Sequence, residues 1–122
     1  MRLKKDYKIA LATGANKEAA LYTITNFGLE FYFDYVIAGN EVKRAKPDPE
    51  IFLKAAEGFS LKPEECVVIE DAIMGIKAAK KAGIAVIVIP DKLTMHQKNG
   101  IADMKLNSIS ELSAETLSRL YD

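Results

Sequence analysis

The sequence predicts an α/β protein in which a parallel β-sheet is covered by helices on both faces. Short apolar or alternating segments at 8–12, 35–38, 67–69 and 84–89 are typical of strands, and amphipathic segments typical of helices lie between them. The segment 84–89 is apolar at every position, as expected for a strand whose two faces are both covered. Strands that alternate with helices in this way form parallel sheets with right-handed crossovers.

The first part of the chain predicts two strands joined by a helix. The strand at 8–12 leads into a turn, Thr13-Gly14-Ala15-Asn16, and then into a helix from about Lys17 to Gly28. The next stretch, 31–35, alternates and fits either a strand or a short helix. We expect the second strand at 35–38, where the residues are Tyr-Val-Ile-Ala.

A polar loop follows the second strand and carries Lys46. Asp48 is a suitable N-cap and Pro49 a suitable first residue for the helix that follows, which we expect to end at Gly58. The sequence thus predicts that Lys46 lies in a loop just before a helix.

The second half of the chain predicts the rest of the sheet. A strand at 67–69 precedes a helix in which Ala72, Ile76 and Ala79 form one apolar stripe, and Gly83 ends that helix. The later elements are expected to be a strand at 84–89, a polar segment at 91–100, a short strand at 102–106 and a helix at 113–121.

Composition limits the classes of function. With 122 residues, 49% hydrophobic and 28% charged, the chain is expected to form one compact domain over residues 1–122. Seventeen basic residues balance seventeen acidic ones, which argues against nucleic acid as the main partner. No apolar run is long enough to span a membrane. The single cysteine, Cys66, is expected to be a small buried residue in a reducing compartment, and we expect a cytoplasmic protein.

Polar residues follow the expected strands where chemistry is usual in α/β proteins. The carboxyl ends of parallel strands share one edge of a sheet, so Thr13-Gly14, Lys46 and Glu70-Asp71 should converge there. Together they suit a phosphate group. Thr13 and the N–H groups near Gly14 lie at a helix N-terminus, Lys46 supplies a positive charge, and the two carboxylates are the oxygen ligands that Mg²⁺ prefers.

Each of these residues also has a purely structural interpretation. Thr13 fits a helix cap, and Lys46 fits a solvated loop lysine. Asp71 fits an N-cap for the following helix, with Glu70 exposed to solvent. The residues alone leave these alternatives open.

The segments that carry these residues resemble the haloacid dehalogenase superfamily, particularly its phosphoglycolate phosphatase and β-phosphoglucomutase branch. Lys8-Ile-Ala-Leu-Ala-Thr13 resembles the family's second motif, and Ala45-Lys46-Pro47-Asp48-Pro49-Glu50-Ile51-Phe52 resembles its third. Val67-Val-Ile-Glu70-Asp71 through Gly83 resembles the fourth, acidic motif. Order and spacing agree, and the similarity covers nearly the whole chain.

The resemblance implies a three-layer, Rossmann-like fold and a Mg²⁺-dependent phosphatase or phosphomutase. Such enzymes act on small phosphorylated metabolites through an aspartyl-phosphate intermediate. By resemblance, Thr13 and Gly14 would bind the transferring phosphoryl group, and Lys46 would stabilise its charge. Glu70 and Asp71 would hold Mg²⁺.

One motif of the family has no counterpart in this sequence. Family members begin with a strand ending in Asp-x-Asp, whose first aspartate is the nucleophile, followed by a helical cap that selects the substrate. No Asp-x-Asp occurs among these 122 residues. The resemblance therefore implies the C-terminal core portion of such an enzyme, truncated at the N-terminus and without its central first strand. We expect the chain alone to be inactive and to bind Mg²⁺ weakly.

A missing central strand would leave two unpaired strand edges, at 8–12 and at 67–69. We expect these strands to pair directly, with self-association as a further stabilisation. A second copy or a complementing N-terminal segment could instead cover the edges. The alternative function is a non-catalytic binding or assembly module on the same scaffold. A response-regulator-like receiver domain is a weaker rival, because it would need an acidic pair where this chain has Thr13.

Overall fold

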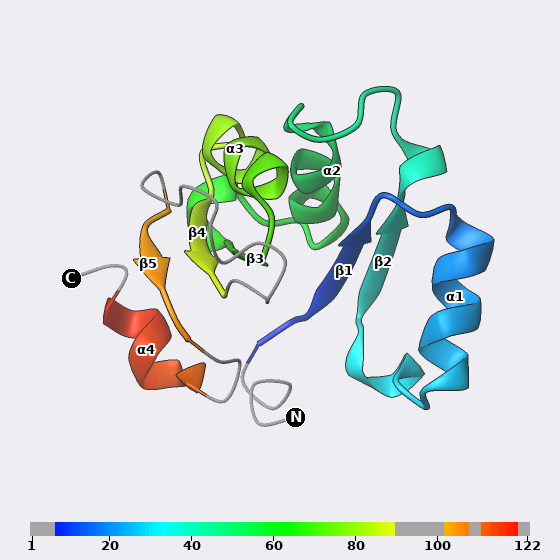
Figure 1. The fold of residues 1–122 in the computed structure, drawn as a ribbon, viewed down its shortest axis with the longest axis horizontal. Helices are drawn as coiled ribbons and strands as arrows, with labels where there is room; N and C mark the ends of the chain where they lie inside the picture. Colours follow the sequence, from blue (N-terminus) through cyan, green and yellow to red (C-terminus); the bar gives the residue numbers. More distant parts are fainter. Residues whose placement is uncertain (1–6, 90–101, 108–110, 120–122) are drawn as a thin grey trace.

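The computed structural model describes residues 7–89, 102–107 and 111–119. In these residues parallel strands alternate with helices along the chain, which confirms the expected α/β class (Figure 1). The polar segment expected at 91–100 lies outside the described residues.

The first part of the chain forms β1 (Ala10–Thr13), α1 (Lys17–Asn26) and β2 (Tyr35–Ala38). The two strands pair in parallel, with Ala10 opposite Tyr35 and Thr13 opposite Ala38. The stretch that fitted either a strand or a short helix contains a 3₁₀ turn at Glu30–Tyr32, and the strand begins after it. The expected strand at 35–38 is therefore confirmed.

The second part of the chain carries the remaining elements. They are α2 (Glu50–Gly58), β3 (Val67–Glu70), α3 (Ile73–Lys81), β4 (Ala85–Val88), β5 (Met104–Lys105) and α4 (Ala114–Ser118). β3, β4 and β5 form a parallel sheet in that order, and Val67 lies opposite Ala85. Gly83 follows α3 with a φ of +76°, a left-handed conformation that suits glycine and ends the helix.

The start of α2 differs from the prediction by one residue. Pro49, not Asp48, is the N-cap residue, and the first helical residue is Glu50. The carboxylate of Asp48 accepts a hydrogen bond from the N–H of Glu50 at 3.0 Å. Because that bond spans two residues, Asp48 holds a turn before the helix, and the helix begins one position later than expected.

Helices cover both faces of the strands. Ile37 of β2 and Val86 of β4 face a core shared with α2 and α3. Ile87, the neighbour of Val86, points to the other face and packs with Leu117 of α4. α1 packs on β2. The layers are therefore helix, strand, helix, as the fold prediction requires.

The strands do not form one continuous sheet, and the expected direct pairing of 8–12 with 67–69 is wrong. β1 pairs only with β2, and β3 only with β4, so the described strands form two separate sheets (Figure 1). α2 packs on β1 and β2 and also against α3, which packs on β3 and β4. The shared core between these helices sets the spacing of the two sheets, and closing the gap would require that core to repack.

A groove of about 620 Å³ lies between β1 and β3. Strand residues 8–12 line one side of it and residues 66–70 the other, and Phe52, Ala55 and Ala56 of α2 contribute to the lining. Cys66 borders this groove and is half-buried, so the expectation of a buried cysteine holds only in part. Burial raises the pKa of its thiol, and the carboxylates of Glu65 and Glu64 add to that effect.

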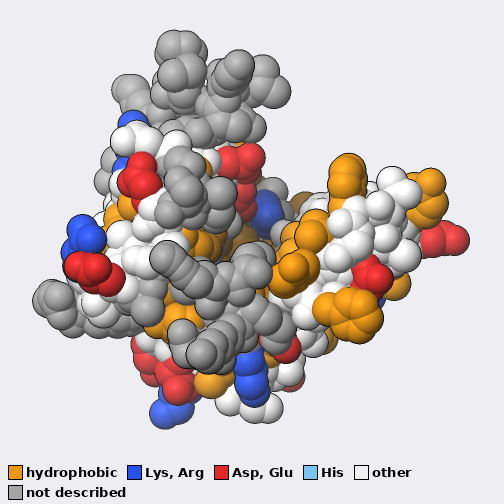
Figure 2. Space-filling model, turned by 90° about the horizontal axis from the view of Figure 1, so that it is seen from below, with side chains coloured by type: hydrophobic (Ala, Val, Ile, Leu, Met, Phe, Trp, Pro, Cys, Tyr) orange, Lys and Arg blue, Asp and Glu red, His pale blue; other side chains and the backbone are white. Residues whose placement is uncertain are grey.

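Exposed apolar side chains lie on α1 and on the residues that follow it. Figure 2 shows hydrophobic side chains gathered on the lobe formed by α1 and the residues after it; they are Leu21, Tyr22, Phe27, Leu29 and Phe31.

Within the described ranges, no helix is both long and apolar enough to cross a membrane.

Candidate functional site

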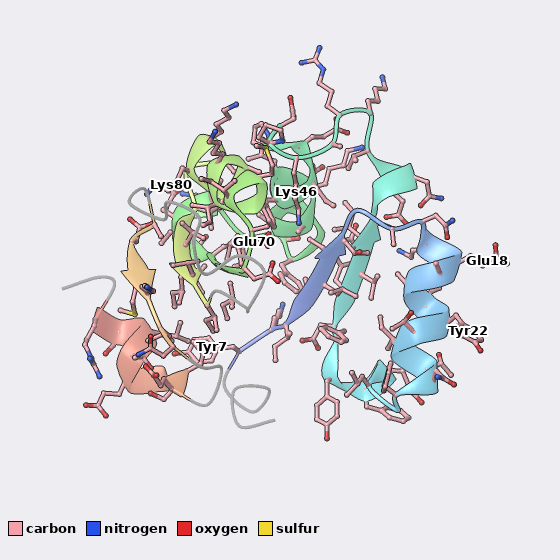
Figure 3. All side chains as sticks on the ribbon, viewed as in Figure 1. Tyr7, Glu18, Tyr22, Lys46, Glu70 and Lys80 are labelled. Atoms are coloured by element: carbon pink, nitrogen blue, oxygen red, sulfur yellow. The ribbon has the colours of Figure 1, made fainter. Side chains whose placement is uncertain are left out.

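The structure brings Lys46 and Glu70 together, although 24 residues separate them in the chain. The ammonium nitrogen of Lys46 lies 3.3 Å from Oε2 of Glu70, and the two side chains point toward each other between α2 and β3 (Figure 3). Their side chains are only 23% and 12% exposed. Lys46 also lies 5.0 Å from the ring centroid of Phe52, which is buried at the start of α2. Lys46 is thus not a solvated loop lysine.

Glu70 is fixed by the backbone that follows it. Its Oε1 accepts hydrogen bonds from the N–H groups of Asp71 at 3.0 Å and of Ala72 at 3.3 Å. A side chain on Gly75, in the first turn of α3, would overlap the Glu70 carboxylate and would force it to move. The carboxylate of Glu70 is therefore held on three sides, by two amides, a lysine and the backbone of α3.

Asp71 does not cap α3. The N-cap residue is Ala72, and no side-chain hydrogen bond caps this helix. The structural interpretation, in which Asp71 caps the helix and Glu70 is exposed to solvent, is therefore wrong. Asp71 is exposed beside Glu70, and both border a hollow of about 250 Å³ at the carboxyl ends of β3 and β4, with Ile69 and Ile89.

Thr13 ends β1 and does not cap α1. Its hydroxyl accepts a hydrogen bond from the N–H of Ala15 at 3.2 Å, and the cap is Asn16, whose Oδ1 accepts the N–H of Ala19 at 2.8 Å. Apart from the chain neighbours of Gly14, no atom of the described residues lies within 4 Å of the position that a side chain there would take. Among the described residues, no hydrogen bond or ion pair joins Thr13 or Gly14 to Lys46 or Glu70. Thr13 and Glu70 end the two strands that border the groove.

The loop after β2 supports the loop after β1. The N–H of Gly39 donates to the carbonyl of Ala15 at 2.7 Å, and the Asn40 side chain accepts the N–H of Lys17 at 2.8 Å. A side chain on Gly39 would overlap the Gly14 carbonyl, so this close approach also needs glycine. The turn 13–16 is therefore held in place from the neighbouring loop.

The carboxylate oxygens at this site are of the type that binds Mg²⁺ together with the oxygens of a phosphate group. Mg²⁺ is commonly held by one or two carboxylates together with waters and phosphate oxygens. Glu70 and Asp71 supply such a pair at one sheet edge. In the described ranges, no cluster of three or more His, Cys, Asp or Glu side chains could hold a metal by itself. Glu70 and Asp71 are therefore a pair of carboxylates that would fit part of such a coordination shell, and Glu70 is already paired with Lys46.

Sequence reasoning missed the residues that hold the loops. Glu50, Asn40 and Gly39 were not among the candidate site residues, yet each bonds or closely approaches a loop at this edge. Glu50 accepts the N–H groups of Lys43 and Arg44 at 2.9 and 3.1 Å. The Lys43 N–H in particular keeps the pKa of Glu50 below its usual value. Residue type and spacing carry no signal for these contacts, because they depend on how two loops meet.

Comparisons with known proteins agree on one family. The family model described as haloacid dehalogenase-like hydrolase matches residues 1–83. A phosphorylated carbohydrates phosphatase of Thermotoga maritima is 46% identical over 80 residues, which is 66% of this chain and 37% of that protein.

Solved structures show the same relationship. CbbY of Rhodobacter sphaeroides, in complex with phosphate, has a TM-score of 0.84 and 33% identity over 92% of this chain and 52% of its own. The β-phosphoglucomutase of Clostridium difficile has a TM-score of 0.82 and 27% identity over 96% of this chain and 50% of its own. The chain spans about half the length of these two solved proteins, and 37% of the length of the Thermotoga maritima phosphatase.

Proposed function

This chain belongs to the haloacid dehalogenase-like hydrolase family, and from that membership we propose that it is the core part of a Mg²⁺-dependent phosphatase or phosphomutase. The substrate class is a small phosphorylated metabolite, and its phosphoryl group passes through an aspartyl-phosphate intermediate. Residues 1–122 form one partial core domain in this proposal. A cytoplasmic location is part of it, because the single cysteine fits a reducing compartment.

The Lys46–Glu70 pair is the observation that carries the proposal. Lys46 and Glu70 lie only 3.3 Å apart and are both largely shielded from water, and Glu70 lies at the carboxyl end of β3, where ligands bind in α/β proteins. Partial burial strengthens the field of both charges. An ammonium group next to a potential metal ligand suits a doubly charged phosphate, which needs neutralisation from both sides.

Each residue has a distinct task in this proposal. The Thr13 hydroxyl and the Gly14 N–H donate hydrogen bonds to oxygens of the transferring phosphoryl group, at the N-terminal end of α1. Lys46 balances the negative charge that these oxygens carry. Glu70 and Asp71 hold Mg²⁺, which supplies charge neutralisation between the carboxylates and the phosphate. Positioning and charge are most of what phosphoryl transfer needs from a protein.

The aspartate nucleophile comes from outside these 122 residues in this proposal. No Asp-x-Asp occurs in the sequence, and Glu70 and Asp71 are both assigned to the metal. The groove between β1 and β3 supports a strand as the complementing segment. Each of these strands has one edge paired and the other facing the groove, and a buried strand edge needs partners for its N–H and C=O groups.

A second function, a non-catalytic binding or assembly module, is favoured by the same groove. A strand edge that no other strand covers is a site for pairing with another chain, including a second copy of this one. The two functions differ in what the site does. The enzyme core binds Mg²⁺ and phosphate at Lys46 and Glu70, whereas the module needs neither ligand.

A titration followed residue by residue tests the proposal. We would titrate the ¹⁵N-labelled chain with Mg²⁺, with orthophosphate, and with both, and record the amide chemical shifts. The proposal predicts weak binding, with shifts confined to 13–16, Lys46 and 70–72. Glu70→Gln and Asp71→Asn should remove the Mg²⁺ shifts. Glu57→Gln is the matched control, because Glu57 is exposed on α2 away from these contacts.

The outcomes separate the two functions. Shifts in other loops, or shifts that persist in both carboxylate variants, would contradict the proposed site. A chain that shows no ligand-induced shifts but sediments as a stable oligomer would support the assembly module instead.

A further inference from the structure

Lys46 lies in a loop that has no regular secondary structure to fix it. The loop joins the 3₁₀ turn at Gly39–Glu41 to α2, which begins at Glu50. One hydrogen bond inside it, from the N–H of Asp48 to the carbonyl of Ala45, forms a turn around Lys46. A turn fixes the local shape of a loop but not its position on the protein. Something else must hold Lys46 against Glu70.

The carboxylate of Glu50 closes this loop into a ring. Oε2 accepts the N–H of Lys43 at 2.9 Å, and Oε1 accepts the N–H of Arg44 at 3.1 Å. Two successive amides that point at one carboxylate form a small anion-binding concavity. Because Glu50 is also the first residue of α2, the ring joins the start of the loop to the helix at its end. Lys46 lies within the closed segment.

Lys54, one turn further along α2, completes the arrangement. Its ammonium nitrogen lies 3.1 Å from Oε2 of Glu50 and donates to the carbonyl of Glu41 at 2.9 Å. The helix itself is anchored in the core by Ile51 and Phe52, which are 2% and 6% exposed. Glu50 and Lys54 therefore connect the beginning of the loop to a helix that is fixed in the core.

We propose that Glu50 and Lys54 form a positioning pair that holds the 41–49 loop so that Lys46 stays against Glu70. Neither side chain contacts Glu70, and neither is assigned to phosphate or metal. Their effect passes through Lys46, whose importance for phosphate rests on the function proposed above. The ring of Phe52 also lies next to Lys46, with its centroid 5.0 Å from the ammonium nitrogen.

A simpler role for Glu50 must be distinguished from this one. A glutamate in the first turn of a helix is favourable because of the helix dipole alone. In that case its loss would lower the stability of the whole fold and would loosen all regions alike. A positioning role instead predicts a change confined to the loop and to Lys46.

The position of Lys46 can be measured through the reactivity of its amine. We would treat the folded chain with a limiting amount of an amine-acylating reagent and quantify each modified lysine by mass spectrometry. Lys80, on α3, serves as the internal reference, because it has its own ion-pair partner, Asp103, at 2.9 Å. The measured quantity is the acylation rate of Lys46 divided by that of Lys80. This readout needs no phosphate or Mg²⁺, so it can fail or succeed independently of the proposed function.

Three variants give the comparison. Glu50→Ala removes both amide contacts and the ion pair with Lys54. Since one hydrogen bond contributes about 1 kcal/mol, the rate ratio should rise about fivefold or more. Glu50→Gln keeps one accepting oxygen and should raise the rate ratio about twofold to threefold. Glu57→Ala, on the exposed part of the same helix, should leave the ratio unchanged.

Amide hydrogen exchange supplies the second readout. Glu50→Ala should accelerate exchange at Lys43 and Arg44 and leave the amides of β4 unchanged. An unchanged rate ratio in Glu50→Ala, or equal acceleration of Lys46, Lys80 and the β4 amides, would overturn the proposal. If Glu50→Ala does not fold, Glu50→Gln decides between the same outcomes.

Discussion

Gly75→Ala tests whether the Glu70 carboxylate is held as the structure shows. Alanine usually stabilises a helix relative to glycine, by up to about 1 kcal/mol in exposed positions. At this position the added Cβ would overlap the carboxylate and the methylene next to it, and all three nearest atoms belong to Glu70. The side chain of Glu70 would have to leave its place, because the helix backbone cannot move without disturbing Ile76, which is fully buried.

The expected cost follows from the contacts that Glu70 loses. It gives up hydrogen bonds from the N–H groups of Asp71 and Ala72 and the ion pair with Lys46. Hydrogen bonds to a charged group contribute about 1.5–3 kcal/mol each, and the longer of these two is weak. After subtracting the gain in helix propensity, we expect Gly75→Ala to destabilise the fold by about 1–2 kcal/mol. For a chain of this length that lowers Tm by about 3–8 °C.

A second variant makes the test specific. In a Glu70→Ala background the space next to position 75 is empty, so Gly75→Ala should now be neutral or stabilising by up to about 1 kcal/mol. Urea unfolding followed by circular dichroism measures all four members of this cycle. The reasoning is refuted if Gly75→Ala stabilises the wild-type chain, or if it costs the same with and without Glu70.

Two further predictions concern acid stability and turnover. Burial opposes ionisation of Asp103, but the Val86 N–H and Lys80 outweigh burial and lower the pKa of Asp103 below its ordinary value of 3.8. The contribution of Asp103 to stability is therefore complete above that value and is lost as pH falls through the folded pKa. Asp103→Asn should remove this part of the acid dependence of the urea midpoint. The chain alone should hydrolyse p-nitrophenyl phosphate no faster than a Glu70→Gln/Asp71→Asn double variant, because these 122 residues contain no Asp-x-Asp nucleophile. Turnover that disappears in the double variant would show this expectation to be wrong.

Local patterns in the sequence were sufficient to predict most of the elements. The apolar strand expected at 84–89 is β4, and Ile76 and Ala79 of the predicted stripe on α3 are fully buried. Lys46 and Glu70 were expected to converge, and they lie 3.3 Å apart, although they follow strands of two separate sheets. These features depend on short stretches of sequence and on one general rule of α/β folds.

The features that the sequence did not predict depend on contacts between distant segments. The expected pairing of 8–12 with 67–69 failed because α2 and α3 share a core that keeps the two sheets apart. The hydrogen bonds that Glu50 accepts from Lys43 and Arg44 were not predicted, because a glutamate is ordinary in the first turn of any helix. The sequence left open whether Glu70 is exposed to solvent, and only its contacts with Lys46 and with the N–H groups of Asp71 and Ala72 show that its carboxylate is largely shielded. Its part in a metal site stays a prediction.

The central claim is that this chain carries the phosphate and metal half of a phosphotransferase site. The titration with Mg²⁺ and orthophosphate tests it most directly when Lys46→Met is compared with the wild-type chain. We predict that phosphate shifts at 13–16 are present in the wild type, increase when Mg²⁺ is added, and disappear in Lys46→Met, while the Mg²⁺ shifts at 70–72 remain. Phosphate shifts that are unchanged in Lys46→Met, or a wild-type chain that binds neither ligand at these residues, would contradict the claim.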